Sequence, residues 1–272
     1  MKKLIVLLLL LFILTVGVQP AAAIVYGDLD GKAHPNVGMI SVFAAGKQQP
    51  LCSGTLIQPR VFLTAGHCTD FLEKAITAGQ LKLDNVKVSF DKDDALANKL
   101  LKVSDVITHP EYDNFRPQSN PHDVGLLILE KEVKNIPIAA LPAPGFLDVL
   151  QAQGKLRQGS KGAKFTVVGY GATLNFPPPE IVRPDGKRRV AQSEFQALHE
   201  SNFILSQNQA TDNAGICNAD SGGPALWSEN GAETLVGIIS AGDDKCVAIG
   251  VYYRADTADT LDFINGIVSD LK

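Results

Sequence analysis

Short apolar runs rich in β-branched residues, separated by Gly, Pro, Asn and Asp, make up most of the chain after Ile24. Runs of this length at this spacing are typical of the strands of a β-sandwich or barrel. We therefore predict an all-β fold. The predicted strands cover Val37 to Phe43, Cys52 to Thr64, Leu101 to Thr108, Val124 to Leu129, Phe165 to Gly169, Thr234 to Ser240 and Gly250 to Arg254.

The C-terminal tail has a different pattern, in which apolar residues share one face of a helix. These residues are Leu261, Ile264, Ile267, Val268 and Leu271. Asp256 and Thr257 stand just before them, and either can cap the helix. The sequence therefore predicts one C-terminal helix.

The N-terminus has the three regions of a secretory signal peptide. Lys2 and Lys3 precede an apolar run from Leu4 to Leu14, and Ala21 and Ala23 fit a cleavage site. Because the run is shorter than the ~20 residues that span a bilayer, we prefer this interpretation to an uncleaved membrane anchor. We predict a signal peptide over residues 1–23, a mature domain over residues 24–272, and an exported protein, either extracellular or periplasmic.

Composition narrows the class of protein. Of the 272 residues, 20% are charged, with 25 Lys and Arg against 29 Asp and Glu. A chain of this length can bury the core of one large domain or of two small lobes. Removing the two N-terminal lysines takes the net charge from −4 to −6, so the mature chain lacks the basic footprint that nucleic acids and anionic membranes require.

Four cysteines in an exported chain indicate disulfides, with three pairings open. Neither Cys-x-x-Cys nor His-Glu-x-x-His is present, so we predict no metal site and no cofactor. The acidic cluster Asp91, Asp93 and Asp94 is weighed as a calcium site and set aside, because its spacing matches no known loop. The charged run from Lys187 to Arg189, at the end of a Pro-rich stretch from Phe176, is interpreted as a solvated turn.

Three local sequences carry the candidate chemistry. They are CSGTLIQPRVFLTAGHC from Cys52, HDVGLLIL from His122 and CNADSGGP from Cys217. Together with VVGYGA from Val167, Ser240-Ala241-Gly242, Gly250-Val251-Tyr252 and Ile24-Val25-Tyr26-Gly27, they resemble the chymotrypsin-like (trypsin-family) serine proteases, in the family's order. The resemblance implies two six-stranded antiparallel barrels with the active site between them and a helix at the C-terminus.

The resemblance also assigns the roles of a Ser-His-Asp triad. Ser221 is then the nucleophile, His67 accepts its proton, and Asp123 orients His67. The run from Ala219 to Gly223 nearly matches the G-x-S-x-G elbow of α/β-hydrolases, but that fold needs a histidine after the serine. The last histidine of the chain is His199, so this alternative fails on order.

By the same resemblance, the backbone N–H groups of Ala219 and Ser221 form the oxyanion hole. The family has glycine where this chain has Ala219, so we expect the Cβ to cost about 1–3 kcal/mol of backbone strain. The resemblance further pairs the ammonium of a free Ile24 with Asp220 in an activating ion pair. Because Ala21-Ala22-Ala23 ends directly before Ile24, we hypothesise that signal peptidase itself exposes this terminus.

The specificity pocket is assigned in the same way. Its expected substrate-binding residues are Gly215, Ile216, Ser240, Gly242 and Gly250. Gly215 stands at the floor, where trypsin-like members have an acid, so we predict chymotrypsin-like or elastase-like cleavage after apolar residues. Asp212, Asp243 and Asp244 are nearby in sequence and are interpreted as solvated loop acids. Ala241 replaces the family's usual tryptophan, which we expect to widen or weaken the adjacent subsite.

The family pairing of the cysteines is Cys52 with Cys68 and Cys217 with Cys246, each bridge contributing about 3–4 kcal/mol through loop entropy. We expect an exported serine endopeptidase that acts as a monomer on polypeptide substrates through an acyl-enzyme, with a protein inhibitor as a further partner. The competing hypothesis is a catalytically silent, protease-like binding protein, for which Ala219 is the only sequence support.

Overall fold

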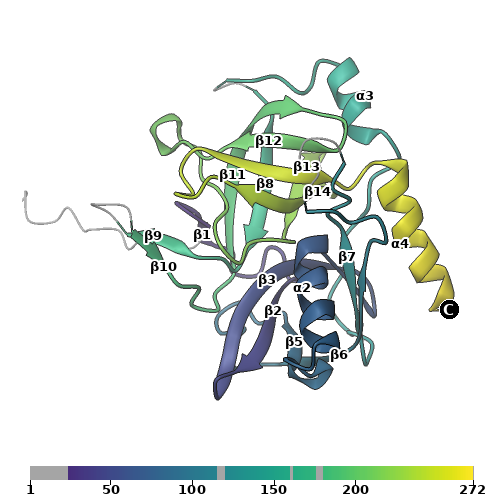
Figure 1. Cartoon of the computed structure of the whole chain (residues 1–272). Coiled ribbons are helices and arrows are strands. Elements are labelled where there is room, and N and C mark those ends of the chain that lie inside the picture. Colours follow the sequence, from purple (N-terminus) through teal and green to yellow (C-terminus); the bar gives the residue numbers. More distant parts are fainter. Residues whose placement is uncertain (1–23, 115–119, 160–161, 176–179, 272) are drawn as a thin grey trace, which may run out of the picture.

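The computed structural model describes residues 24–114, 120–159, 162–175 and 180–271. The predicted signal peptide, residues 1–23, lies outside these ranges, as does the Phe176 end of the predicted Pro-rich stretch. Two β-barrels pack against each other, and a C-terminal helix runs along one side of both (Figure 1).

The first barrel comes from the N-terminal half of the chain. Its strands are β2 (Val37–Ala44), β3 (Lys47–Gln58), β4 (Val61–Thr64), β5 (Val86–Ser89), β6 (Leu101–Thr108) and β7 (Gly125–Leu129). They pair antiparallel in the order β2-β3-β4-β7-β6-β5, and pairing of β2 with β5 closes the barrel. Phe62, Val88 and Leu126 are fully buried in its core. Helix α2 (Gly66–Thr77) follows β4 and packs on β6 and β7, and a 3₁₀ turn, η1 (Leu83–Asn85), precedes β5.

The second barrel comes from the C-terminal half. Its strands are β8 (Lys164–Gly169), β11 (Arg189–Leu198), β12 (Asn202–Ser206), β13 (Pro224–Glu229), β14 (Ala232–Gly242) and β15 (Ile249–Arg254). Antiparallel pairing of β8 with β11 closes this barrel. The short strand β1 (Asp28–Leu29) pairs with β11, β9 (Thr173–Asn175) and β10 (Glu180–Val182) form a separate hairpin, and η2 (Gln209–Thr211) is a 3₁₀ turn. The predicted pair of six-stranded barrels is confirmed.

The predicted C-terminal helix is also confirmed, as α4 (Ala258–Asp270). Of the two expected caps, Thr257 is the one used, because its side chain accepts a hydrogen bond from the Thr260 N–H. The Asp256 carboxylate instead pairs with Arg254 and accepts the N–H of Leu147, at the start of α3 (Phe146–Ala152). Within the described ranges, no helix has both the length and the apolar character needed to cross a membrane.

Some elements differ from the sequence pattern. The run from Cys52 to Thr64 forms two strands, β3 and β4, because the chain turns at Pro59, which has no N–H to continue the ladder. The pattern does not predict α2, α3 or the strands β1, β5, β9, β10, β11, β12 and β13. Pairing with neighbouring strands and packing against the barrels, rather than a periodic apolar run, fix these elements.

The interpretation of Lys187 to Arg189 as a solvated turn is wrong for both arginines. The side chain of Arg188 is only 2% exposed, and Arg189 is also buried. The guanidinium of Arg188 donates to Asp30 Oδ2 (2.7 Å), to three backbone carbonyls and to the Tyr170 hydroxyl. Arg189 makes a two-armed ion pair with Asp185. These partners replace the water that a charged side chain loses on burial.

Candidate active site

His67 and Asp123 lie beside the ends of two neighbouring strands of the first barrel, β4 and β7. His67 is the second residue of α2, directly after β4, and the disulfide between Cys52 and Cys68 ties this helix to β3. Asp123 stands just before β7, which pairs with β4. His67 Nδ1 lies 3.1 and 3.0 Å from the two carboxylate oxygens of Asp123, and the His67 backbone N–H donates to Asp123 Oδ1 (2.8 Å). The β4–β7 pairing thus brings together residues 56 positions apart.

The two side chains stabilise each other's charged form. Burial acts to raise the pKa of Asp123, but His67 and the Ser240 hydroxyl, which donates to Asp123 Oδ2 at 2.5 Å, outweigh it and lower that pKa. Burial likewise acts to lower the pKa of His67, but the charge and hydrogen bond of Asp123 outweigh it and raise that pKa. The pair therefore holds an anionic carboxylate beside an imidazole of increased basicity.

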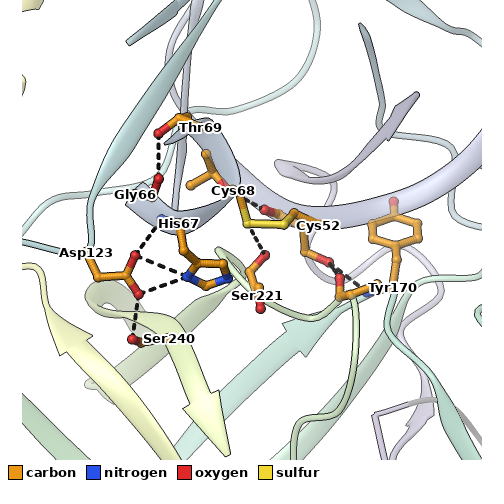
Figure 2. The surroundings of a disulfide bond; sticks show 12 residues. Cys52, Gly66, His67, Cys68, Thr69, Asp123, Tyr170, Ser221 and Ser240 are labelled. Atoms are coloured by element: carbon orange, nitrogen blue, oxygen red, sulfur yellow. Dashed lines mark hydrogen bonds and ion pairs between the residues drawn. A yellow bond between two sulfur atoms is a disulfide. The ribbon is translucent and has the colours of Figure 1, made fainter. Parts of the chain in front are cut away.

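Ser221 comes from the second barrel, in the turn before β13. The His67 imidazole lies between the Asp123 carboxylate and Ser221 (Figure 2). The Ser221 carbonyl accepts the N–H of Ser53 on β3 (2.8 Å), which joins the two barrels at this point. Within the described residues Ser221 Oγ forms no hydrogen bond to His67, a contact that is often loose until substrate binds.

The turn that carries Ser221 has two residues in the left-handed region, Ala219 (φ +73°) and Gly222 (φ +84°). A Cβ at Gly222 would lie 2.0 Å from Thr64 Oγ1, so only glycine fits. At Ala219 the Cβ is present, at a strain of about 1–2 kcal/mol. The N–H groups of Ala219 and Ser221 donate to no other described residue and so are available to a ligand.

Asp220 lies between these two residues and is fully buried. Its carboxylate accepts the backbone N–H groups of Gly171 (2.7 Å) and Cys217 (2.9 Å). Burial raises the pKa of Asp220 to about 7, against the opposing effects of the two N–H groups and of Arg189. Such a carboxylate favours a cationic partner close by.

Ile24, like Asp220, is fully buried. Its side chain is fully buried among apolar residues of the second barrel, which include Ile216. Val25 pairs with Gly215, five positions before Asp220, and the Gly215 N–H donates to the Val25 carbonyl (3.0 Å). Ile24 itself has φ +44°, a costly value for a β-branched residue.

A pocket opens beside Ser221. Of the expected substrate-binding residues, Ile216, Ser240 and Gly242 line it. Gly215 and Gly250 are not among its described lining residues: a Cβ at Gly215 would collide with Gln207, and one at Gly250 would meet Tyr252.

Gln207 was not expected from the sequence and is fully buried beside Gly215 and Ile216. Its carbonyl oxygen accepts the N–H of Ile216, and its amide donates to the Ile249 carbonyl (3.0 Å) and more distantly to Asp243 Oδ1 (3.4 Å). The side chain thus connects Ile216, the start of β15 at Ile249 and the loop after β14 at Asp243. Its neighbour in sequence, Ser206, ends β12, and no motif marks a buried glutamine at that point.

Two of the three nearby acids, Asp243 and Asp244, line the pocket, whereas Asp212 is exposed and stands outside its described lining. The Asp243 carboxylate turns into its own loop, where it accepts the N–H groups of four residues, Lys245, Val247, Ala248 and Ile249. Burial acts to raise the pKa of Asp243, but these four N–H groups outweigh it and lower the pKa. Asp243 is therefore a structural anion of the pocket wall, whereas Asp212 and Asp244 match the interpretation of exposed loop acids.

A second pocket lies on the other side of Ser240 and Ala241 and reaches His67 and Tyr112. Ala241 borders both pockets, so no large side chain separates them. Cys217 and Cys246 form the second disulfide, which joins the turn before Ser221 to the pocket wall.

The acidic cluster does not converge on a shared cation position. Asp91 Oδ1 accepts the N–H groups of Asp93 and Asp94 (3.0 Å each), and Lys99 lies 3.7 Å from Asp91 Oδ2. The described part of the chain brings these three carboxylates into no common ligand group.

Comparisons with known proteins agree with this geometry. The sequence model of the Trypsin family matches residues 30–264. The chain is 29% identical over 202 residues to venom serine protease 34 of Apis mellifera, which covers 71% of this chain and 46% of that protein. It is 26% identical over 249 residues to CLIP domain-containing serine protease B15 of Anopheles gambiae (85% and 66%). It is 27% identical over 225 residues to mast cell protease 2 of Meriones unguiculatus (80% and 81%). The chain thus spans about half to two thirds of the length of these two insect relatives.

Proposed function

Because the chain belongs to the trypsin family, we propose that it is a serine endopeptidase that cleaves polypeptides through an acyl-enzyme, with Ser221, His67 and Asp123 as its triad. The observation that carries the proposal is the paired contact of the Asp123 carboxylate with Nδ1 and the backbone N–H of His67. That contact leaves the other ring nitrogen, Nε2, to serve the nucleophile.

In the proposed reaction, Ser221 Oγ attacks the substrate carbonyl while its proton passes to His67 Nε2. Asp123 fixes the tautomer of His67 and stabilises the imidazolium. The N–H groups of Ala219 and Ser221 stabilise the oxyanion, and His67 then gives the proton to the leaving amine. Water, activated by the same base, hydrolyses the acyl-enzyme.

The nucleophile is tested by labelling with a fluorophosphonate. Residues 24–272 with a free Ile24 are expected to take up one label, and Ser221→Ala is expected to abolish it. Ser269→Ala, at an exposed serine of α4, is the matched control and keeps full labelling. A correctly processed chain that takes up no label favours the silent binding protein.

The orienting acid is tested by Asp123→Asn, which keeps the shape of the side chain and removes its charge. An amide can present its N–H to Nδ1 and so select the wrong tautomer of His67. We expect kcat to fall by about 10⁴-fold with little change in KM. A loss below tenfold would show that His67 does not depend on this carboxylate.

We further propose that cleavage before Ile24 activates the enzyme through an ion pair between the new ammonium and Asp220. The supporting observations are the burial of Ile24 and the raised pKa of Asp220. Losing one partner of such a buried pair costs about 3–5 kcal/mol, which corresponds to roughly 10²–10⁴-fold in activity. A chain that begins at Ala22 is therefore expected to be about 10²–10⁴-fold less active than one that begins at Ile24. Equal activity would exclude the ion pair as the activating device.

The proposed preference is for apolar residues before the cleaved bond. The pocket has Ile216, Ile239 and Ala241 in its lining. Of its two acids, Asp243 already accepts four N–H groups, and Asp244 is an exposed loop residue. Cleavage of a peptide library is expected to favour Phe, Leu or Ala at this position. A preference for Lys or Arg would overturn the assignment.

The proposed location is outside the cytoplasm, either extracellular or periplasmic, after removal of a signal peptide over residues 1–23. The pattern of Lys2, Lys3 and the apolar run supports it, as do the two disulfides. N-terminal sequencing of the exported protein should read Ile-Val-Tyr-Gly. We also propose that the mature enzyme is a monomer and that a protein inhibitor can fill the substrate cleft.

A further inference from the structure

Three metal-binding side chains meet beside the C-terminal helix. His109 follows β6, His122 directly precedes Asp123, and Asp259 lies in the first turn of α4. One ligand atom of each lies within 4.8 Å of the others. His122 and Asp259 are 137 residues apart, so no sequence motif announces the group.

Both imidazoles present a nitrogen to the same carboxylate oxygen. Asp259 Oδ2 lies 2.8 Å from His122 Nδ1 and 3.5 Å from His109 Nε2. The two rings are stacked with their centroids 4.7 Å apart. In a tetrahedral zinc site with metal–ligand distances of about 2.0–2.1 Å, neighbouring ligand atoms lie about 3.3 Å apart. The two nitrogen–oxygen distances, 2.8 and 3.5 Å, lie on either side of this spacing.

The surroundings of His122 also match those of a metal ligand. Its second nitrogen, Nε2, lies 3.4 Å from Glu111 Oε2. Metal-bound histidines commonly donate their other N–H to a carboxylate, which fixes the tautomer and leaves the facing nitrogen free to coordinate. Asp259 Oδ2 is a carboxylate oxygen and so accepts a proton from Nδ1 at 2.8 Å; a bound zinc would take the place of that proton, with Glu111 as the partner of Nε2.

We propose that His109, His122 and Asp259 bind one zinc ion, with water as the fourth ligand. Two imidazoles and one carboxylate suit zinc, whereas calcium and magnesium select oxygen ligands. The other described group of this kind, His67 with Cys52 and Cys68, has both cysteines in a disulfide and so lacks thiolates.

Zinc has to displace two existing hydrogen bonds. At His122, the ion would replace the proton that Nδ1 donates to Asp259 Oδ2. The Glu111 N–H donates to His109 Nδ1 at 3.2 Å, and coordination at Nε2 would move the ring proton to Nδ1. Glu111 is exposed, so its N–H can bond to water instead. In return, the metal would tie the segment that carries Asp123 to α4.

The test is zinc titration of residues 24–272 carrying Ser221→Ala, followed by isothermal calorimetry at neutral pH. Its result does not depend on whether the chain is a protease. We expect one zinc per chain at micromolar affinity or tighter, no heat from calcium or magnesium, and a rise in Tm with zinc. Asp259→Asn and His122→Asn are each expected to weaken binding at least about tenfold.

Two matched controls separate this site from adventitious binding. Asp262→Asn removes an exposed acid from the same helix, and His199→Asn removes an exposed histidine elsewhere. Both are expected to bind zinc like the parent chain. Unchanged affinity in Asp259→Asn, or a loss of similar size in either control, would overturn the proposal and leave a hydrogen-bonded histidine pair.

Discussion

Two buried aspartates, Asp30 and Asp220, have surroundings with opposite effects on the carboxyl pKa. Burial acts to raise the pKa of Asp30, but hydrogen bonds and charges from His34 and Arg188 outweigh it and lower the pKa to about 2. Asp220 has only backbone N–H groups as hydrogen-bond partners among the described residues, and burial raises its pKa to about 7. The Asp30 carboxylate is therefore bonded to cationic side chains, whereas the Asp220 carboxylate accepts hydrogen bonds from backbone N–H groups of the described residues.

The difference suggests an order of events. Arg188 joins Asp30 to the first barrel through the carbonyls of Val37 and Phe90, and His34 adds a contact with Glu233 (3.1 Å). These contacts involve no free terminus, so they can form before any cleavage. We propose that they hold the N-terminal segment of the mature chain in place, so that freeing the ammonium of Ile24 completes the ion pair with Asp220 without a large rearrangement.

The largest expected effect on stability comes from removing the ion pair between Arg188 and Asp30. Arg188→Met keeps an unbranched apolar stem but leaves the Asp30 carboxylate buried without its arginine. We expect the free energy of unfolding to fall by about 3–5 kcal/mol, measured by urea denaturation at neutral pH. Adding Asp30→Asn should recover part of that loss, because no buried charge remains.

The matched control is Lys187→Met, which removes a neighbouring positive charge that is exposed. We expect it to change the free energy of unfolding by less than about 0.5 kcal/mol. If both variants lose a similar amount of unfolding free energy, the loss comes from the change in net charge and not from the contact between Arg188 and Asp30.

The next effect is the pH dependence of stability. The pKa of Asp220 is raised from 3.8 to about 7, so the folded state binds its proton more tightly than the unfolded state does. In a chain that begins at Ala22, this group should make stability fall as pH rises from 4 to 7, by about 4 kcal/mol in total. Asp30 has the opposite sign: its contribution is present above about pH 4 and is lost as pH falls toward 2.

Comparison with a chain that begins at Ile24 sharpens this result. A free ammonium next to Asp220 should lower its pKa and flatten the profile between pH 4 and 7, whereas Asp220→Asn should flatten it in the longer chain. Urea unfolding across this range, with Ser221→Ala in every chain to prevent self-cleavage, measures both. A steep fall that persists with a free Ile24 would argue against the ion pair.

The β-rich class and the family were predictable because their signals are local, and the resemblance to the family then implied the two barrels. Alternating apolar runs mark strands, and the segments around His67, Asp123 and Ser221 are each read within a few residues. The strained turn at Ala219 was predictable for the same reason, since a single Cβ in a Gly-rich turn is visible in the sequence.

The misses depend on distant partners. Arg188 resembles a solvated charge until Asp30, 158 positions away, is placed beside it. In the sequence, Gln207 resembles any polar loop residue. Its burial depends on hydrogen bonds to Ile216 and Ile249, which the sequence does not place beside it. The His109, His122 and Asp259 group is assembled by one barrel and the terminal helix. Sequence periodicity reports which residues are buried but not which buried polar groups find each other.

The smallest expected effect concerns Ala219, the residue before Asp220. Ala219→Gly removes the Cβ from a turn with φ +73°, which should raise the free energy of unfolding by up to about 1 kcal/mol and kcat by up to about fivefold. Ala45→Gly is the matched control, because Ala45 has φ +51° in the exposed turn between β2 and β3. It should gain similar stability with no change in kcat. If kcat of Ala219→Gly also stays unchanged, the backbone strain at Ala219 does not affect the N–H groups proposed for the oxyanion hole. The proposed ion pair of Asp220 would then be the feature of this turn that controls kcat.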